Sequence, residues 1–259
     1  MPEFSSHIQG TPSWVELSTT DDQAALAFYG AWFGWVDDLQ EMGPGMYYHI
    51  QKLRGLEVAA MYQQGNEEQQ QGVPPHWRTY FTVDDIAKTT EQANESGATV
   101  MFGPIEVFDA GHAAVPQDPQ GAVFAMPQGK NYIGVRVKDE TGAIMWTELL
   151  TNAAEDATKF YSDLLGMSSS KMPGPVDYTT LKVGGTDVAG VMAISDEMAP
   201  GPPHRMVYFG IDDVDAAASK IESLGGSIMV PPADIPDVGR FAGLKDPQGS
   251  VFFIFKPAV

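Results

Sequence analysis

Cysteine is absent from this chain of 259 residues. The absence excludes disulfides, thiolate nucleophiles and zinc sites with cysteine ligands, and it is compatible with a reducing compartment. Lysine and arginine are scarce, at 15 residues against 34 aspartates and glutamates, which gives a formal net charge of −19 at pH 7. Because so acidic a chain is repelled by phosphate backbones and anionic lipid surfaces, we expect neither a nucleic-acid partner nor a membrane partner.

Long apolar runs are absent as well. No stretch of about 18 uninterrupted apolar residues occurs, and the N-terminal sequence MPEFSSHIQG lacks the basic and apolar segments of a signal peptide. We therefore expect a cytoplasmic protein. The chain also carries no glycine-rich phosphate loop, no HExxH helix and no GxSxG elbow, so none of these motifs indicates a reaction.

An internal repeat is the main positive feature. Residues 11–35, TPSWVELSTTDDQAALAFYGAWFGW, are matched by residues 143–167, AIMWTELLTNAAEDATKFYSDLLGM. Two further pairs follow at an offset of 128: PPHWRTYFTVDD (74–85) with PPHRMVYFGIDD (202–213), and DPQGAVFAM (118–126) with DPQGSVFFI (246–254). Such a period indicates duplicated units. We predict a first domain at 1–128, a linker at 129–141 and a second domain at 142–259.

Each half divides again into two units of one strand, one helix and three strands. Capping signals at 20–23 and 152–155 predict that the first helix of each half starts at Thr20 or Asn152. Glycines at 34 and 166 predict where these two helices end. The second helices are expected to start at the Asp-Asp pairs 84–85 and 212–213. Each Asp-Pro-Gln-Gly predicts a tight turn before a last strand at 122–126 or 250–254. The polar stretch 63–72 predicts a solvated loop or, as the less favoured alternative, a lid over the concave sheet of the first half.

These features resemble the vicinal oxygen chelate superfamily, which includes glyoxalase I, bleomycin-resistance proteins and extradiol dioxygenases. The resemblance rests on the Phe-Tyr helix ends at 28–29 and 160–161, the Asp-Asp helix starts and the Asp-Pro-Gln-Gly turns. Within the superfamily, the chain bears a closer likeness to the two-domain glyoxalase-like proteins common in actinobacteria. It implies an α+β fold in which four βαβββ modules form two homologous domains with curved mixed sheets, a pseudo-dimer within one chain.

Metal-using members of that superfamily hold their metal with His, Glu or Gln on the first and last strands of paired modules. In this chain the corresponding positions hold no such residue, being Trp14, Arg78, Trp146, Met206, Ala60, Ala125, Gly190 and Phe253. We therefore predict no metal and no cofactor. An alignment slip of two residues would leave a Glu/His site open, built from Glu16, Glu148, His76 and His204.

A Trp and a Glu stand two residues apart in both copies, as Trp14 with Glu16 and Trp146 with Glu148. Alternate residues of a strand share a face, so each pair is expected to line one cupped sheet. The buried carboxylates then need partners. Expected partners are Arg78 and the hydroxyls of Tyr80 and Tyr208. The predicted ligand-binding residues are Trp14, Trp146, Arg78, Tyr80, Met206, Tyr208, Tyr48, Tyr178 and Phe253.

Two functions remain open at this point. The first is a monomeric, metal-free protein that binds a small aromatic or cationic molecule in two related cups, the first more polar and the second more apolar. The second is an enzyme of the lyase, isomerase or antibiotic-biosynthetic type, in which Glu16 or Glu148 acts as a general base next to a carbonyl. A metal-dependent glyoxalase is the third and least favoured alternative.

Overall fold

The computed structural model describes residues 3–174, 176–195 and 201–258. The first domain begins with a module of one strand, one helix and three strands, followed by a short extra helix: β1 (Pro12–Thr19), α1 (Asp22–Phe33), β2 (Val36–Gly43), β3 (Met46–Leu53), β4 (Leu56–Gln63) and α2 (Asn66–Gln70). Its second module comprises β5 (His76–Phe81), α3 (Ile86–Glu95), β6 (Thr99–Val107), β7 (Gly111–Gln117) and β8 (Met126–Gly129).

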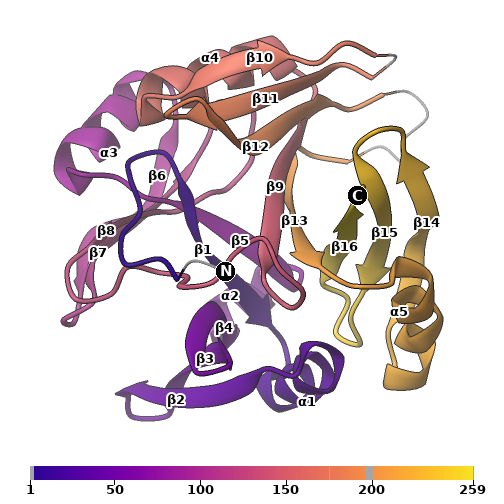
Figure 1. Cartoon of the computed structure of the whole chain (residues 1–259). Helices are drawn as coiled ribbons and strands as arrows, with labels where there is room; N and C mark the ends of the chain where they lie inside the picture. Colours follow the sequence, from indigo (N-terminus) through magenta and orange to yellow (C-terminus); the bar gives the residue numbers. More distant parts are fainter. Residues whose placement is uncertain (1–2, 175, 196–200, 259) are drawn as a thin grey trace.

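The second domain repeats this order. Its first module is β9 (Ile144–Thr151), α4 (Ala154–Leu165), β10 (Ser168–Lys171), β11 (Tyr178–Val183) and β12 (Thr186–Ala193). Its second module is β13 (His204–Gly210), α5 (Val214–Lys220) with the 3-10 turn η1 (Ile221–Leu224), then β14 (Ser227–Ile235), β15 (Gly239–Lys245) and β16 (Val251–Pro257). The predicted four modules and the α+β class are thus confirmed, and Figure 1 shows the modules arranged around β1, β5, β9 and β13.

The two domains differ in how continuous their sheets are. The second domain has one eight-stranded sheet in the order β10-β11-β12-β9-β13-β16-β15-β14. The first has a five-stranded sheet, β2-β3-β4-β1-β5, and a three-stranded sheet, β6-β7-β8, linked by a single bridge between Tyr80 and Ala125. The prediction of a strand at 122–126 is therefore wrong for most of that segment, because the backbone there makes only isolated bridges and β8 begins at Met126.

The second helix of each domain starts as predicted, after Asp85 and Asp213, whereas for the first helices the ends were predicted better than the starts. Gly34 and Gly166 both end their helices in the left-handed conformation that glycine adopts without strain, with φ of 72° and 69°. The cap of α1 is Asp21 rather than Thr20, because the Asp21 carboxylate accepts a hydrogen bond from the Ala24 amide at 2.9 Å. The predicted cap at Asn152 is also wrong, since α4 starts after Ala153 without a side-chain cap.

The polar stretch 63–72 contains a helix rather than only a loop. Glu68 folds back so that its carboxylate accepts a hydrogen bond from the Gly65 amide at 3.1 Å, which stabilises the first turn of α2. The prediction of a plain solvated loop is wrong for residues 66–70.

The two domains pack through their first helices. Helix α1 places Tyr29 so that its hydroxyl donates to Asp246 of the opposite domain at 3.0 Å, and α4 places Tyr161 so that it donates to Asp118 at 2.7 Å. Both aspartates begin the Asp-Pro-Gln-Gly turns. Each carboxylate also accepts hydrogen bonds from two backbone amides of its own turn. The contact between domains is therefore reciprocal, and it leaves the concave faces of the sheets outside the interface.

No helix within the described ranges is both long and apolar enough to cross a membrane.

Candidate functional site

Strand register places the repeated Trp and Glu side chains on the concave sheet faces. In the first domain Trp14 lies opposite Tyr80 and Glu16 opposite Arg78. In the second domain Trp146 lies opposite Tyr208 and Glu148 opposite Met206. Residues directly opposite each other in an antiparallel pair share a face, so these side chains line one cup per domain. We call the cup of Trp14 and Glu16 the first cup and that of Trp146 and Glu148 the second cup.

The tryptophan makes the same contact in both cups. The Trp14 indole nitrogen donates to the Tyr48 hydroxyl at 2.9 Å, and the Trp146 nitrogen donates to the Tyr178 hydroxyl at 2.7 Å. In the second cup this contact requires a glycine beside it. A Cβ atom at Gly190 would lie 2.0 Å from the Tyr178 hydroxyl, which is far inside van der Waals contact.

The carboxylate of the first cup is fully paired. Arg78 donates from Nη1 to Glu16 Oε1 at 3.2 Å, and the Tyr48 hydroxyl donates to Glu16 Oε2 at 2.8 Å. The pairing with Arg78 expected from the sequence is therefore present. Tyr80 lies on the same face, and its burial together with the nearby Glu16 charge raises the pKa of the Tyr80 hydroxyl. The negative charge of Glu16 is thus compensated by the guanidinium of Arg78, which reduces the attraction of the first cup for a cationic ligand.

Two further groups cover the first cup. Tyr132, from the segment between the domains, packs edge-on against Trp14 with ring centroids 5.4 Å apart, and Trp14 is only 5% exposed. At the other end of β1, Glu68 of α2 accepts a hydrogen bond from the Tyr62 hydroxyl at 3.1 Å. The polar stretch 63–72 therefore contributes a cover over this cup, which was the less favoured of its two predicted roles.

The carboxylate of the second cup has no cation opposite it. Met206 occupies the position of Arg78, and Glu148 is 5% exposed. The Tyr208 hydroxyl donates to Glu148 Oε1 at 3.2 Å. Burial raises the pKa of Glu148 to about 7, although the neighbouring hydroxyls of Tyr178 and Tyr208 act in the opposite direction. This carboxyl group therefore exchanges its proton near neutral pH, as general acids and bases do.

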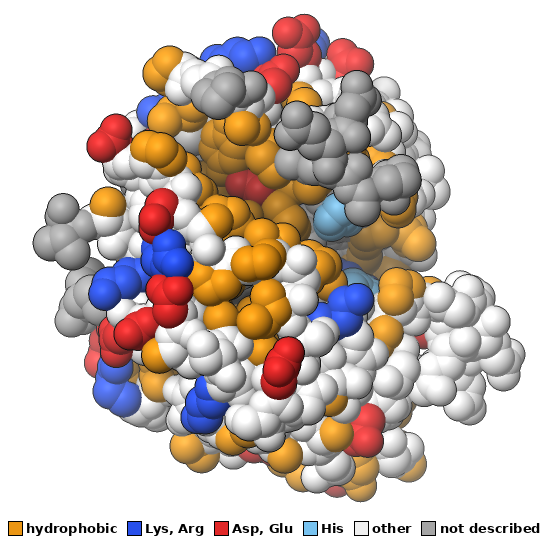
Figure 2. Space-filling model, turned by 90° about the vertical axis from the view of Figure 1, so that its right-hand side faces the viewer, with side chains coloured by type: hydrophobic (Ala, Val, Ile, Leu, Met, Phe, Trp, Pro, Cys, Tyr) orange, Lys and Arg blue, Asp and Glu red, His pale blue; other side chains and the backbone are white. Residues whose placement is uncertain are grey.

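Aromatic rings form one wall of the second cup. Phe253 of β16 stacks on Tyr208 with centroids 4.8 Å apart, and Phe241 of β15 lies nearly parallel to Phe253 at 6.4 Å. Gly243 leaves room for this stack, because a Cβ atom there would lie 2.8 Å from the Phe253 ring. Figure 2 shows a hollow lined by hydrophobic side chains on the side of the second domain, with an acidic group inside it. In contrast to Trp14, Trp146 is partly exposed.

The side chains of the cups do not fit a divalent metal ion. In the first cup, Arg78 and Tyr48 already occupy the Glu16 oxygens, and Arg78 also donates to His76 Nε2 at 3.1 Å. Across the part of the chain that the structure describes, no three His, Asp or Glu side chains are grouped so that they could hold a metal ion. The Glu/His site left open by the sequence is thus not assembled in either cup.

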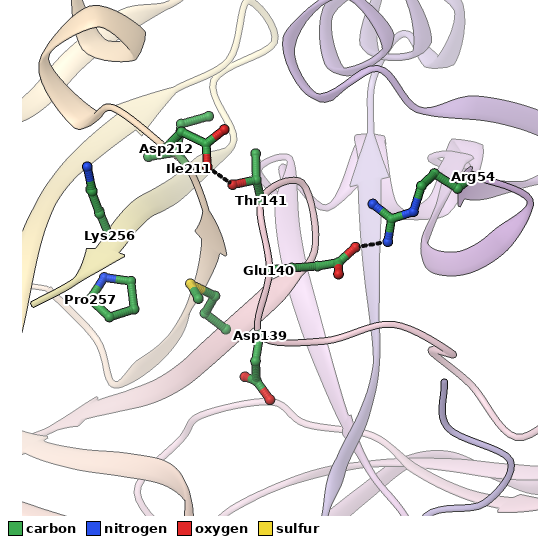
Figure 3. Close-up of a pocket in the computed structure, with 9 residues that line it drawn as sticks. Arg54, Asp139, Glu140, Thr141, Ile211, Asp212, Lys256 and Pro257 are labelled. Atoms are coloured by element: carbon green, nitrogen blue, oxygen red, sulfur yellow. Dashed lines mark hydrogen bonds and ion pairs between the residues drawn. The ribbon is translucent and has the colours of Figure 1, made fainter. Parts of the chain in front are cut away.

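A surface depression of about 480 Å³ lies outside both cups, between the end of β3, the segment before β9 and the end of β16 (Figure 3). Two of its charged groups, Arg54 and Glu140, pair with each other, and a third, Asp212, accepts a hydrogen bond from the Thr141 hydroxyl. None of the predicted site residues lines it. We therefore place the candidate site in the cups, where the buried ionisable groups are, and not in this depression.

Sequence reasoning missed several residues of the cups. Tyr132 belongs to a segment without a counterpart in the repeat, so no alignment could assign it to the first cup. Phe241 and Gly243 align at the offset of 128 with Ala113 and Val115, so the repeat gave no sign that their strand forms an aromatic wall. Glu68 lies in the polar stretch 63–72, whose composition favoured a solvated loop over a lid and singled out no residue.

Comparison with known proteins gives one family. A family model described as the Glyoxalase/Bleomycin resistance protein/Dioxygenase superfamily matches residues 11–126 and 143–253, once in each domain. A protein of Mycobacterium bovis named "Putative glyoxylase CFP32" is 41% identical over 264 residues, covering 100% of this chain and 99% of that protein. The "Anthracycline biosynthesis protein DnrV" of Streptomyces peucetius is 33% identical over 260 residues, covering 95% of this chain and 92% of that protein.

Solved structures share the fold at low identity. The Mn(II)-bound glyoxalase from Novosphingobium aromaticivorans aligns with a TM-score of 0.67 and 17% identity, over 95% of this chain and 82% of that chain. The 2,3-dioxygenase LapB from Pseudomonas sp. KL28 aligns with a TM-score of 0.67 and 14% identity, over 97% of this chain and 94% of that chain. The family model and the relatives confirm the resemblance inferred from the sequence, and the solved structures confirm the fold class.

Proposed function

Since the chain belongs to the glyoxalase/bleomycin resistance protein/dioxygenase superfamily, we propose that it binds a planar, uncharged aromatic molecule in its second cup without a catalytic metal. One observation carries the proposal: Glu148 is buried among aromatic and aliphatic side chains, with Met206 where the first cup has Arg78. A carboxyl group with a pKa of about 7 is neutral in a large part of the molecules at neutral pH, so it can donate a hydrogen bond to a ligand oxygen.

The walls of the second cup support an aromatic ligand. Parallel rings such as Tyr208 and Phe253 offer a face on which another planar ring can stack. Relatives named for anthracycline biosynthesis are consistent with this ligand class. The first cup, with its paired Glu16 and covered Trp14, is proposed to be mainly structural. We further expect a cytoplasmic monomer that acts without nucleic-acid or membrane partners, with domain boundaries near 128 and 142.

Tryptophan fluorescence tests the location of the site. We expect anthraquinone to quench the emission of the wild-type protein and of Trp14→Phe in a saturable manner. Quenching should be lost in Trp146→Phe, because that indole lies in the second cup. Saturable quenching that persists in Trp146→Phe but disappears in Trp14→Phe would place the ligand in the first cup and contradict the proposal.

A second candidate function is favoured by the pKa of Glu148. In an enzyme that uses it as a general base, a Glu148 oxygen takes a proton from a ligand carbon next to a carbonyl, and the electron pair moves onto the carbonyl oxygen. The enolate oxygen would then accept a hydrogen bond from a tyrosine hydroxyl, and the candidates are Tyr178 and Tyr208, which both lie beside Glu148. Such a base contributes on the order of 100- to 10,000-fold in rate.

Glu148→Gln separates the two candidates. For a binding protein, the amide keeps a hydrogen-bond donor in the cup, and we expect affinity to change by less than about 10-fold. For an enzyme, deuterium exchange in D₂O at the carbon next to the carbonyl of a bound ketone, followed by NMR, should fall to the uncatalysed rate. Wild-type protein that binds the ketone without accelerating this exchange would exclude the second candidate for that ketone.

A further inference from the structure

His204 lies at the mouth of the second cup. It begins β13 opposite Leu150, a residue of the second cup's apolar cluster, and it is two residues from Met206, which faces Glu148. Because alternate residues of a strand share a face, His204 is on the concave face with Met206. Strand rise places it about 7 Å along the strand from the level of Glu148. The side chain is exposed, so it stands at the rim rather than at the floor.

The imidazole is held in one orientation by the preceding residues. His204 Nδ1 lies 2.9 Å from the Pro202 carbonyl oxygen. A carbonyl oxygen only accepts, so Nδ1 carries the proton and Nε2 of the neutral ring is an acceptor. The same arrangement occurs at His76, whose Nδ1 lies 2.9 Å from the Pro74 carbonyl oxygen. The Pro-Pro-His sequence thus sets the ring in the same way in both domains.

The first cup shows where Nε2 points when the ring is held in this way. His76 Nε2 accepts a hydrogen bond from Arg78, two residues further along the strand, at 3.1 Å. The equivalent neighbour of His204 is Met206, whose side chain has no hydrogen to donate. Within the described residues, the contact of Nδ1 with Pro202 is the one hydrogen bond that the His204 side chain makes. Its Nε2 is therefore an acceptor over an apolar cup.

We propose that His204 is a second polar contact for the ligand, and that it selects planar aromatic compounds with a hydroxyl group at the end that faces the mouth. The proposal rests on the proposed function of the second cup. The ligand hydroxyl donates to His204 Nε2, the ring system lies against Tyr208 and Phe253, and the other end approaches Glu148. The cup thereby distinguishes a hydroxylated ring system from the same ring system without the hydroxyl group.

The experiment compares two probes, anthraquinone and 2-hydroxyanthraquinone, by Trp146-dependent fluorescence quenching. We expect the wild-type protein to bind the hydroxylated probe about 5-fold more tightly, as one hydrogen bond allows. In His204→Ala this preference should vanish, while the affinity for anthraquinone stays within about 2-fold of wild type. His76→Ala is the matched control, because it removes the equivalent ring from the first cup, and it should keep the preference.

The possible outcomes separate the two proposals. Preference for the hydroxylated probe that survives in His204→Ala, or that is lost equally in His76→Ala, would overturn the role of His204 and leave the second cup as the binding site. Equal affinity of the wild-type protein for both probes would also overturn the role of His204. If neither probe gives Trp146-dependent quenching, both the role of His204 and the proposed function are wrong.

Discussion

Glu148 should make the protein less stable as the pH rises through neutrality. Burial raises its pKa from an ordinary value of 4.5 to about 7 in the folded protein. Between these two values the folded state retains a proton that the unfolded state releases. The free energy of unfolding contributed by this group is therefore highest below about pH 4.5 and is lost as the pH approaches and passes 7.

The expected magnitude follows from the size of the pKa shift. At 1.36 kcal/mol per pKa unit, a rise from 4.5 to about 7 corresponds to about 3 kcal/mol. Glu148→Gln removes the titrating group while keeping a carbonyl oxygen that can accept from Tyr208. The stability of this variant relative to wild type should thus increase by about 3 kcal/mol between pH 4.5 and pH 8.

Urea unfolding at a series of pH values measures this difference. Groups that titrate elsewhere cancel, because they are common to both proteins. Glu16→Gln is the matched control. It should destabilise the protein at every pH in this range, by about 2 kcal/mol, because it leaves the Arg78 guanidinium without its charged partner. A stability difference between wild type and Glu148→Gln that does not change with pH would show that Glu148 is solvated, and the reasoning would fail.

Three further outcomes are expected. In Met206→Arg, the new guanidinium should pair with Glu148 as Arg78 pairs with Glu16 in the first cup, and it should lower the pKa of Glu148. Anthraquinone binding, measured by fluorescence titration, should weaken by at least about 10-fold, and unchanged affinity would contradict this. Purified protein should hold no stoichiometric zinc, nickel, manganese or iron by elemental analysis; one metal ion per domain, lost in Glu148→Ala, would refute the metal-free site. Tyr29→Phe should lower the free energy of unfolding by about 2 kcal/mol, measured in urea, because Asp246 loses a buried hydrogen bond; a change below about 0.5 kcal/mol would show that this contact is weak.

The fold was predictable because the residues that recur in the repeat have structural roles in each module. Gly34 and Gly166 occupy the same left-handed helix end. The spacing of Trp14 and Glu16 by two residues predicted a shared face whatever the neighbouring strands were, and their register agrees with it. Local rules of this kind need only the periodicity of a strand or the geometry of a helix end.

The difference between the cups was less predictable, because it depends on contacts between residues far apart in the chain. The pKa of Glu148 is set by its burial against β13, together with hydroxyl groups from β11 and β13. The cover over Trp14 comes from Tyr132, a residue of the segment between the domains. The presence of Met206 at the position equivalent to Arg78 did indicate a more apolar second cup. The sequence offered no means, however, of estimating how this difference changes the pKa of the Glu148 carboxyl group.

The reciprocal bonds of Tyr29 and Tyr161 with the turns of the opposite domain make each half a required part of the other half's fold. A half expressed alone would leave a turn aspartate without its tyrosine and would expose the aromatic surface around α1 or α4 to water. After duplication, selection for folding therefore acts on both halves together, whereas the cups lie outside this shared interface and can change separately. The first domain can keep the Glu16–Arg78 ion pair, which favours folding. The second domain can retain the buried Glu148, which lowers stability but is available to bind the ligand of the proposed function.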